Sequence, residues 1–183
     1  MNDEHQYCTF YLCDLYFGLP VLNVQEVIRI QTMTRVPLAP PSVRGLINLR
    51  GQIVTALDLR RQLDLPDRLP DELPVNVVIQ TDDGVVSLLV DEIGDVLSVS
   101  EHDFESSPPT LQGTARELIL GAYKLPDRLL LILDTERTIN LTNQSRGVGR
   151  QTDAHLLPDE TESPRRPSGP QVRHDSPNRL RFL

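Results

Sequence analysis

The chain has 183 residues, with 18 Lys and Arg against 26 Asp and Glu, and its formal net charge is −8. A net negative chain is not attracted to phosphate backbones or anionic lipid, which argues against nucleic-acid binding and a membrane-surface role. No apolar run reaches the roughly 18 residues that a membrane-spanning helix needs. The polar, acidic N-terminus does not resemble a secretion signal. These features predict a cytoplasmic protein.

Composition divides the chain near residue 141. Up to Leu141 there are 11 basic and 21 acidic residues, whereas from Thr142 onward there are 7 basic and 5 acidic. The second segment holds 5 of the 15 prolines and has no apolar periodicity, so it cannot bury enough apolar surface to offset the entropy of ordering. We therefore expect a folded unit, residues 5–141, and a disordered tail, residues 142–183. The closing Leu180-Arg-Phe-Leu183 is either a solvated end or a short docking motif.

Short apolar runs follow one another through the expected folded unit, separated by Gly, Pro, Asp or Asn. Each run has the length of a strand and is rich in residues that favour β structure. The runs are residues 7–12, 16–21, 24–30, 52–57, 75–80, 85–90, 93–99 and 128–133. Asp82-Asp83-Gly84 is a hairpin signal. Because helical patterns are few and short, the sequence predicts a mostly antiparallel, all-β protein of small barrels or sandwiches.

Two internal matches indicate a duplication. Residues 45–63 align without a gap with residues 121–139, at an offset of 76, and residues 17–27 align with residues 86–96, at an offset of 69. Two matches in the same order predict two related halves. We expect two small barrels, the first mainly residues 16–65 and the second mainly residues 75–134, with terminal segments crossing over. A groove between them is a natural binding site.

No constellation of residues points to catalysis, a metal or a cofactor. Cys8 and Cys13 have neither metal-type nor redox-type spacing, the four His are scattered, and Lys124 is the only lysine. The repeat relates Asp58 to Asp134, but each follows a strand and precedes a helical pattern. We interpret them as helix N-caps rather than an acid–base pair.

An acidic cluster lies among the prolines at 66, 70 and 74 and consists of Asp64, Asp67, Asp71 and Glu72. It lacks the alternating ligands and central Gly of a calcium loop. We interpret it as a solvated linker between the two halves.

Two charged positions stand out against apolar surroundings. Glu26 interrupts an aliphatic run, and its repeat partner Asp95 is also acidic, whereas the repeat partner of Arg50 is the uncharged Pro126. Solvent exposure is the simplest account of Arg50. Glu26, which has aliphatic neighbours on both sides, could pair with an Arg at the edge of a groove, because Arg and aliphatic side chains carry much of protein–protein recognition.

Taken together, these segments resemble the CheW-type chemotaxis coupling protein, that is, the CheW-like domain family. The resemblance covers residues 5–141, and its most specific part is the run from Gly45-Leu-Ile-Asn-Leu-Arg-Gly51 to Asp58, preceded by Val24-Gln-Glu-Val27. It implies two pseudo-symmetric, five-stranded SH3-like barrels that share a core, with short helices. It also implies a non-enzymatic adaptor, without cofactor, that joins the cytoplasmic tip of a methyl-accepting receptor to the regulatory domain of the histidine kinase CheA.

The resemblance also implies a receptor-binding site, because in the family the receptor hairpin lies in the groove between the barrels. The matching positions are two apolar groove contacts, a charged pair and a polar neighbour: Val21, Val24, Glu26, Arg50 and Asn48. We add Ile93, which the repeat relates to Val24. The residues that contact the kinase lie at the barrel ends and are not assigned. The adaptor would sit in the cytoplasm, associated with receptor arrays through its partners and not inserted in the membrane.

Two alternatives stay open at this point. One is a coupling protein of a chemosensory-like pathway that controls pili or another non-flagellar output. The other is a small-barrel ligand-binding module or enzyme, which would need a convergent cluster of His, Cys or carboxylate side chains in the groove. The tail is longer and richer in proline than a minimal coupling protein needs, and it is too short and polar to form a receiver domain.

Overall fold

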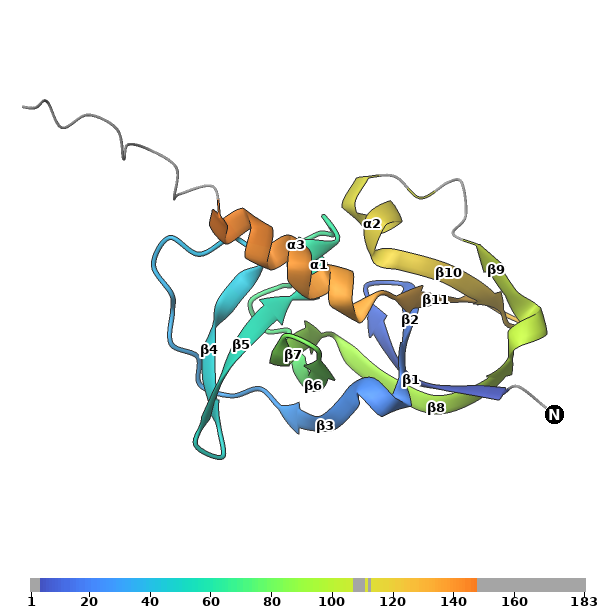
Figure 1. Cartoon of the computed structure of the whole chain (residues 1–183), viewed down its shortest axis with the longest axis horizontal. Helices are drawn as coiled ribbons and strands as arrows, with labels where there is room; N and C mark the ends of the chain where they lie inside the picture. The colour runs from blue at the N-terminus through green and yellow to red at the C-terminus, as the bar shows by residue number, and fades with distance from the viewer. Residues whose placement is uncertain (1–3, 107–110, 112, 148–183) are drawn as a thin grey trace, which may run out of the picture. The chain divides into compact units, whose positions relative to one another are not determined.

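The computed structural model describes residues 4–106, 111 and 113–147, so the expected disorder of the tail lies mostly outside the described residues. The first sheet has the strand order β8-β1-β2-β11-β10-β9, and the second sheet has the order β3-β6-β7-β5-β4 (Figure 1). The first sheet contains β1 (Glu4–Leu12), β2 (Leu15–Pro20), β8 (Glu92–Ser100), β9 (Phe104–Ser106), β10 (Ile119–Lys124) and β11 (Leu129–Leu133). The second contains β3 (Val24–Arg29), β4 (Val43–Leu49), β5 (Gln52–Asp58), β6 (Val75–Thr81) and β7 (Gly84–Val90). The expected all-β class is confirmed.

Helices are few among the described residues, as expected. They are α1 (Leu59–Gln62), α2 (Gly113–Leu118) and α3 (Thr135–Gly147), together with the 3-10 turns η1 (Val21–Asn23) and η2 (Glu101–Asp103). However, α3 has 13 residues and extends through residues 142–147, which we expected to belong to the disordered tail. The interpretation of the two repeated aspartates as N-caps is confirmed. An Asp58 carboxylate oxygen accepts a hydrogen bond from the Arg60 backbone N–H at 3.1 Å, and Asp134 accepts one from the Arg137 N–H at 2.9 Å. Such a cap is worth about 1 kcal/mol. No helix in the described ranges is long and apolar enough to cross a membrane.

The strand registers confirm the internal repeat position by position. Each sheet contains one parallel pair of strands, which is β5 with β7 in the second sheet and β11 with β2 in the first. Shifting the residue numbers of one parallel pair by the two sequence offsets gives the residue pairs of the other. The equivalent cross-strand pairs are Thr55–Val86 and Leu131–Phe17 in the parallel ladders, and Val24–Ile79 and Ile93–Phe10 in the antiparallel ladders. Ile93 is therefore the structural counterpart of Val24, as the repeat predicts.

The repeat halves and the sheets do not coincide, which corrects the expected barrel boundaries of residues 16–65 and 75–134. The second sheet takes residues 24–58 from the first half and β6 and β7 from the second half. The first sheet takes β1 and β2 from the first half and its other strands from residues 92–133. Each half thus gives its first hairpin to the other sheet. The sequence-based boundaries placed β6 and β7 in the wrong barrel, because the parallel ladders join strands that are distant in sequence.

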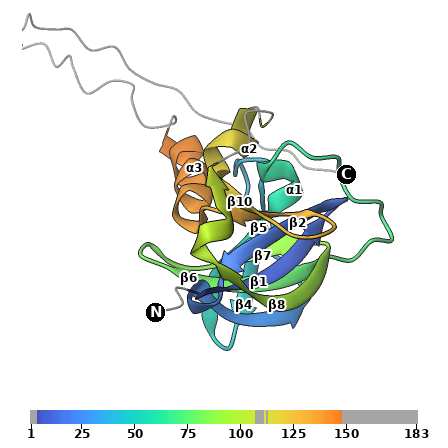
Figure 2. The same cartoon turned by 90° about the vertical axis from the view of Figure 1, so that its right-hand side faces the viewer.

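One core is shared by the two sheets. In Figure 2 the first hairpin lies over β5 and β7, and buried side chains from both sheets form one cluster. Phe10 and Phe17 stack with their ring centroids 5.6 Å apart, and neither exposes more than 1% of its surface. Leu57 and Leu88 of the second sheet belong to the same cluster. Burying each such side chain contributes about 1.5–3 kcal/mol, so the hairpin exchange is held by apolar packing.

Two repeated glycines lie where a further segment pairs with a strand, because Thr34 forms a bridge to Leu46 beside Gly45 and β9 pairs with β10 at Gly121. A Cβ atom added at Gly45 would lie 2.7 Å from the Thr34 carbonyl oxygen, and one at Gly121 would collide with the Glu105 carbonyl. We expect Gly45→Ala to lower the free energy of unfolding by about 1–3 kcal/mol, because backbone atoms cannot move aside cheaply. Urea unfolding followed by circular dichroism measures this. A change below about 0.5 kcal/mol would show that the Thr34 segment moves away without cost.

Candidate functional site

The predicted receptor-binding residues lie on edge strands and on the turns beside them (Figure 1). Val21 is in η1, which joins β2 to β3, and Val24 and Glu26 are in β3, an edge strand of the second sheet. Ile93 is in β8, an edge strand of the first sheet. Val24 and Ile93 are half-buried and pack against the shared core. Equivalent residues of the two halves therefore lie at equivalent edges.

The turn between β4 and β5 presents Arg50. Arg50 and Gly51 are its two central residues, with φ angles of 52° and 92°. The Asn48 side-chain oxygen accepts a hydrogen bond from the Gly51 N–H at 2.8 Å and fastens the turn. Glycine takes the positive φ at Gly51 without cost. Arg50 takes the same region at a cost of about 1–2 kcal/mol, so turn propensity does not explain an arginine there.

Arg50 reaches the neighbouring edge strand and pairs with Glu26. Its Nη2 lies 2.8 Å from a Glu26 carboxylate oxygen, although the two residues are 24 positions apart in sequence. The Arg50 side chain is 79% exposed and that of Glu26 is 18% exposed. An ion pair with one exposed partner contributes little to stability. The ion pair therefore fixes the position of the Arg50 guanidinium, while the other N–H donors of that group stay accessible to a partner.

A pocket of about 410 Å³ lies beside η1. We call it the η1 pocket, and it is lined by Glu4, His5, Gln6, Tyr7, Pro20, Val21 and Leu22. Leu22 is 98% exposed although it is aliphatic. Val21 is the one predicted receptor-binding residue in this lining. Asn48 and Arg50 are positioned by the β4–β5 turn instead.

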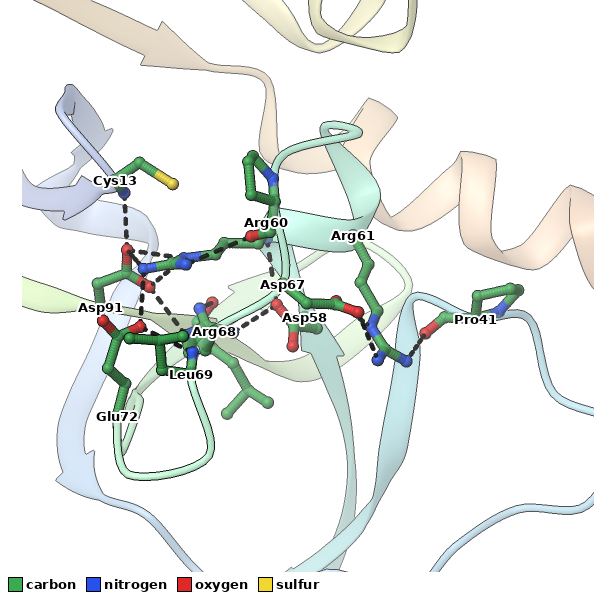
Figure 3. A network of polar contacts seen from close by, with 12 residues as sticks. Cys13, Pro41, Asp58, Arg60, Arg61, Asp67, Arg68, Leu69, Glu72 and Asp91 are labelled. Carbon is green, nitrogen blue, oxygen red and sulfur yellow. Dashed lines mark hydrogen bonds and ion pairs between the residues drawn. The ribbon is translucent and has the colours of Figure 1, made fainter.

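A buried cluster of charges was missed by sequence reasoning (Figure 3). Asp91 lies between β7 and β8, where the chain crosses from the second sheet to the first. Its carboxylate accepts hydrogen bonds from Arg60 Nε at 2.9 Å, from Arg68 Nε at 2.8 Å and from the Cys13 backbone N–H at 2.7 Å. Cys13 is in the β1–β2 turn of the first sheet, and Arg60 is in α1 beside the second. One carboxylate therefore ties both sheets together.

Burial makes this cluster energetically different from a surface ion pair. The Arg68 side chain is 8% exposed, that of Arg60 is 11% and that of Asp91 is 17%. Arg68 Nη1 also lies 2.6 Å from Asp58. Burial acts to raise the pKa of Asp91, but hydrogen bonds from Arg60 and the Cys13 N–H, with the nearby Arg68 charge, hold that pKa below its usual value. Asp91 is therefore charged at neutral pH.

The acidic segment between the halves is only in part the solvated linker that we expected, because its acidic residues are exposed but its one arginine is buried. Arg68, from the middle of this segment, is buried between Asp58 and Asp91, and Arg61 Nε lies 2.8 Å from Asp67. The segment packs against the β7–β8 crossover because its arginine finds two buried carboxylates. A lone Arg within an acidic run was a signal, but its partners are 10 and 23 residues away and no local pattern reveals them. Across the described ranges, no three His, Cys, Asp or Glu side chains are grouped to hold a metal ion.

Comparison with known proteins agrees with this architecture. The CheW-like domain matches residues 6–143 of the chain. This chain belongs to the CheW-like domain family. Chemotaxis protein CheW of Bacillus subtilis is 33% identical over 136 residues, which cover 74% of this chain and 86% of that protein. Chemotaxis protein CheW of Klebsiella aerogenes is 30% identical over 135 residues, covering 74% and 81%.

A solved structure of the family has the same fold. The scaffolding protein TtCheW from Thermoanaerobacter tengcongensis aligns with a TM-score of 0.65 at 26% identity, covering 74% of this chain and 86% of that chain. Proteins of the CheW-like family are scaffolds or adaptors and not enzymes. The chain is therefore a scaffold protein of chemotactic signal transduction, which is the class that the resemblance implied.

Proposed function

We propose that this chain couples methyl-accepting chemotaxis receptors to the histidine kinase CheA in a ternary complex. The protein would lie in the cytoplasm and reach membrane receptor arrays through these partners. The observation that carries the proposal is the Glu26–Arg50 pair. It stands at the edge of the second sheet, with Arg50 in a positive-φ turn position that local structure does not favour.

The proposed receptor surface combines apolar and charged contacts. Val21, Val24 and Ile93 supply half-buried aliphatic side chains, each at a sheet edge or beside one. Glu26 and Arg50 supply charge, and Asn48 holds the turn that presents Arg50. Aliphatic side chains at the sheet edges together with a charged pair suit a helical hairpin whose apolar face carries acidic and basic neighbours. We propose these six residues as the receptor-binding set.

Reconstitution tests the proposal directly. The full chain is mixed with a soluble receptor signalling-domain fragment and CheA, and complexes are separated by size while kinase autophosphorylation is measured. We expect a ternary complex, and a receptor-dependent change in kinase activity that requires this protein. A chain that is folded by circular dichroism but joins neither partner would refute the coupling role.

A further inference from the structure

Two polar side chains lie buried inside the second sheet without a partner. Asn76 of β6 and Ser87 of β7 each expose 0% of their surface. Within the described residues, neither polar atom of the Asn76 amide has a hydrogen-bond partner, and the Ser87 hydroxyl has none either. Both strands are inner strands of their sheet (Figure 1). Buried amides and hydroxyls in native proteins almost always bond to protein or to ordered water, so these two groups need an explanation.

The two side chains share one face of the sheet. Val78 stands opposite Ser87 in the β6–β7 ladder, and Asn76 is two residues from Val78. Because side chains alternate along a strand, all three point to the same face. Their neighbours Val77 and Leu88 belong to the core that the two sheets share, on the other face. Asn76 and Ser87 are therefore diagonal neighbours on the face that turns away from that core.

The spacing of diagonal neighbours suits a bridging molecule better than a direct bond. Residues in this relation are separated by about 7–8 Å across an antiparallel pair, which short side chains such as Asn76 and Ser87 do not span. A water molecule between them adds two hydrogen bonds of about 2.8 Å each. The Asn76 amide and the Ser87 hydroxyl each supply donors and acceptors. Together they can offer the two to four hydrogen bonds that a buried water makes.

Small residues surround Ser87 on its other side. Ala56 pairs with Ser87 in the β5–β7 ladder, and Gly45 pairs with Ala56 in the β4–β5 ladder. A row of Ser, Ala and Gly carries few side-chain atoms, so it crowds the Ser87 hydroxyl little. Ala56 is fully buried, and Met33 packs against the small cluster to which it belongs. The place beside Ser87 is therefore uncrowded and shielded from solvent.

A polar pocket opens beside Asn76 and gives water a route to it. The pocket has a volume of about 280 Å³, and its lining includes Leu89, the cross-strand partner of Asn76 in the β6–β7 ladder. Asp58 and Arg68 also line it. Charged walls keep such a pocket hydrated, so a water molecule reaches Asn76 without crossing the apolar core that the sheets share.

We propose that Asn76 and Ser87 form a binding site for a buried water molecule inside the second sheet. The water accepts a hydrogen bond from Asn76 Nδ2 and donates one to Ser87 Oγ, which satisfies both buried groups. An apolar occupant would leave them unsatisfied. None of the six proposed receptor-binding residues belongs to this site, so the proposal goes beyond the coupling role and does not rest on it.

Oxygen-17 relaxation dispersion of the full chain tests the site, because it detects water molecules that stay bound far longer than surface water. It reports on the oxygen of water and is blind to exchanging hydroxyl protons. We expect the double variant Asn76→Leu with Ser87→Ala to lose the contribution of at least one bound molecule. Asn140→Leu, the same exchange at an exposed position of α3, should lose none. Circular dichroism shows whether each variant is folded.

An unchanged oxygen-17 contribution in the folded double variant overturns the proposal. If that variant does not fold, the wild-type chain decides, through NOE and ROE transfer from water to the Asn76 side-chain amide. Cross peaks of opposite sign, together with an oxygen-17 dispersion, show a long-lived water and support the site. Missing cross peaks, or cross peaks of equal sign as expected at the exposed Asn140, overturn it. Cross peaks without an oxygen-17 dispersion also overturn it, because they come from the Ser87 hydroxyl proton.

Discussion

Replacing Asp91 with Ala should lower the free energy of unfolding by about 3–5 kcal/mol, the largest loss that we expect from a single polar substitution in this chain. The substitution removes the carboxylate that Arg60 and Arg68 share, and both guanidinium groups are buried. It also leaves the Cys13 backbone N–H without the acceptor that it has at 2.7 Å. Urea unfolding followed by circular dichroism at neutral pH measures the change.

A matched variant separates burial from charge. Asp67→Ala removes the partner of Arg61, but the Asp67 side chain is 67% exposed, so we expect almost no change in stability. Similar losses of unfolding free energy for the two variants would mean that the Asp91 cluster is hydrated and that its burial adds no stability. Equal stability of Asp91→Ala and the wild type would contradict the conclusion that the Asp91 carboxylate holds the two sheets together.

The same cluster predicts a dependence of stability on pH. The pKa of Asp91 is lower in the folded chain than in the unfolded chain. A depressed pKa contributes stability that is complete above the unfolded value, about 4, and is lost as the pH falls through the folded value. We therefore expect wild-type stability to fall below about pH 4 more steeply than that of Asp91→Asn. Parallel pH profiles for the two proteins would show that other carboxylates control acid unfolding.

Replacing Arg50 with Glu should weaken receptor binding by about 100-fold, because a like charge then faces whatever acidic group Arg50 contacts across the interface. The fold should survive, since Arg50 is 79% exposed and its pair with Glu26 adds little stability. Binding of a receptor signalling-domain fragment measured by calorimetry gives the affinity, and thermal unfolding gives the stability. Arg116→Glu, an exposed arginine on α2, is the matched control and should bind normally.

A charge swap sharpens the interpretation of Arg50. The double variant Glu26→Arg with Arg50→Glu keeps an ion pair within the chain but reverses the charges that a partner meets. We expect it to bind the receptor fragment no better than Arg50→Glu alone. Recovery of wild-type affinity would show that the pair matters only for the local structure. A melting temperature well below that of the wild type would likewise make Arg50 structural.

Local patterns and the repeat predicted much of the fold. Apolar runs indicated strands because alternate side chains enter a core, and the two offsets predicted which residues are equivalent, down to the Val24–Ile93 relation. The membership of the sheets was not predictable in this way, because it depends on the parallel ladders of β5 with β7 and β11 with β2. No residue in these strands marks its partner, and the partner lies tens of residues away.

The charged residues likewise divide into those that the local sequence makes noticeable and those whose role depends on partners distant in sequence. Glu26 and Arg50 each stood out, because Glu26 interrupts an aliphatic run and the repeat partner of Arg50 is uncharged, but only the family resemblance suggested that they form a pair. The role of Arg68 could not, because its two carboxylates come from the end of β5 and from the β7–β8 crossover. In the sequence it is one arginine in an acidic segment, which is the composition of a solvated linker.

The exchange of hairpins between the halves has a consequence for how this chain can be divided. A cut between residues 63 and 74 separates the two repeats cleanly in sequence, yet neither fragment contains all the strands of either sheet. The fragments should be unfolded alone and should regain structure only when mixed, as two subunits of a domain-swapped dimer do. Duplication has therefore produced a pair of mutually dependent halves, and the protein should unfold in a single cooperative transition in spite of its two sheets.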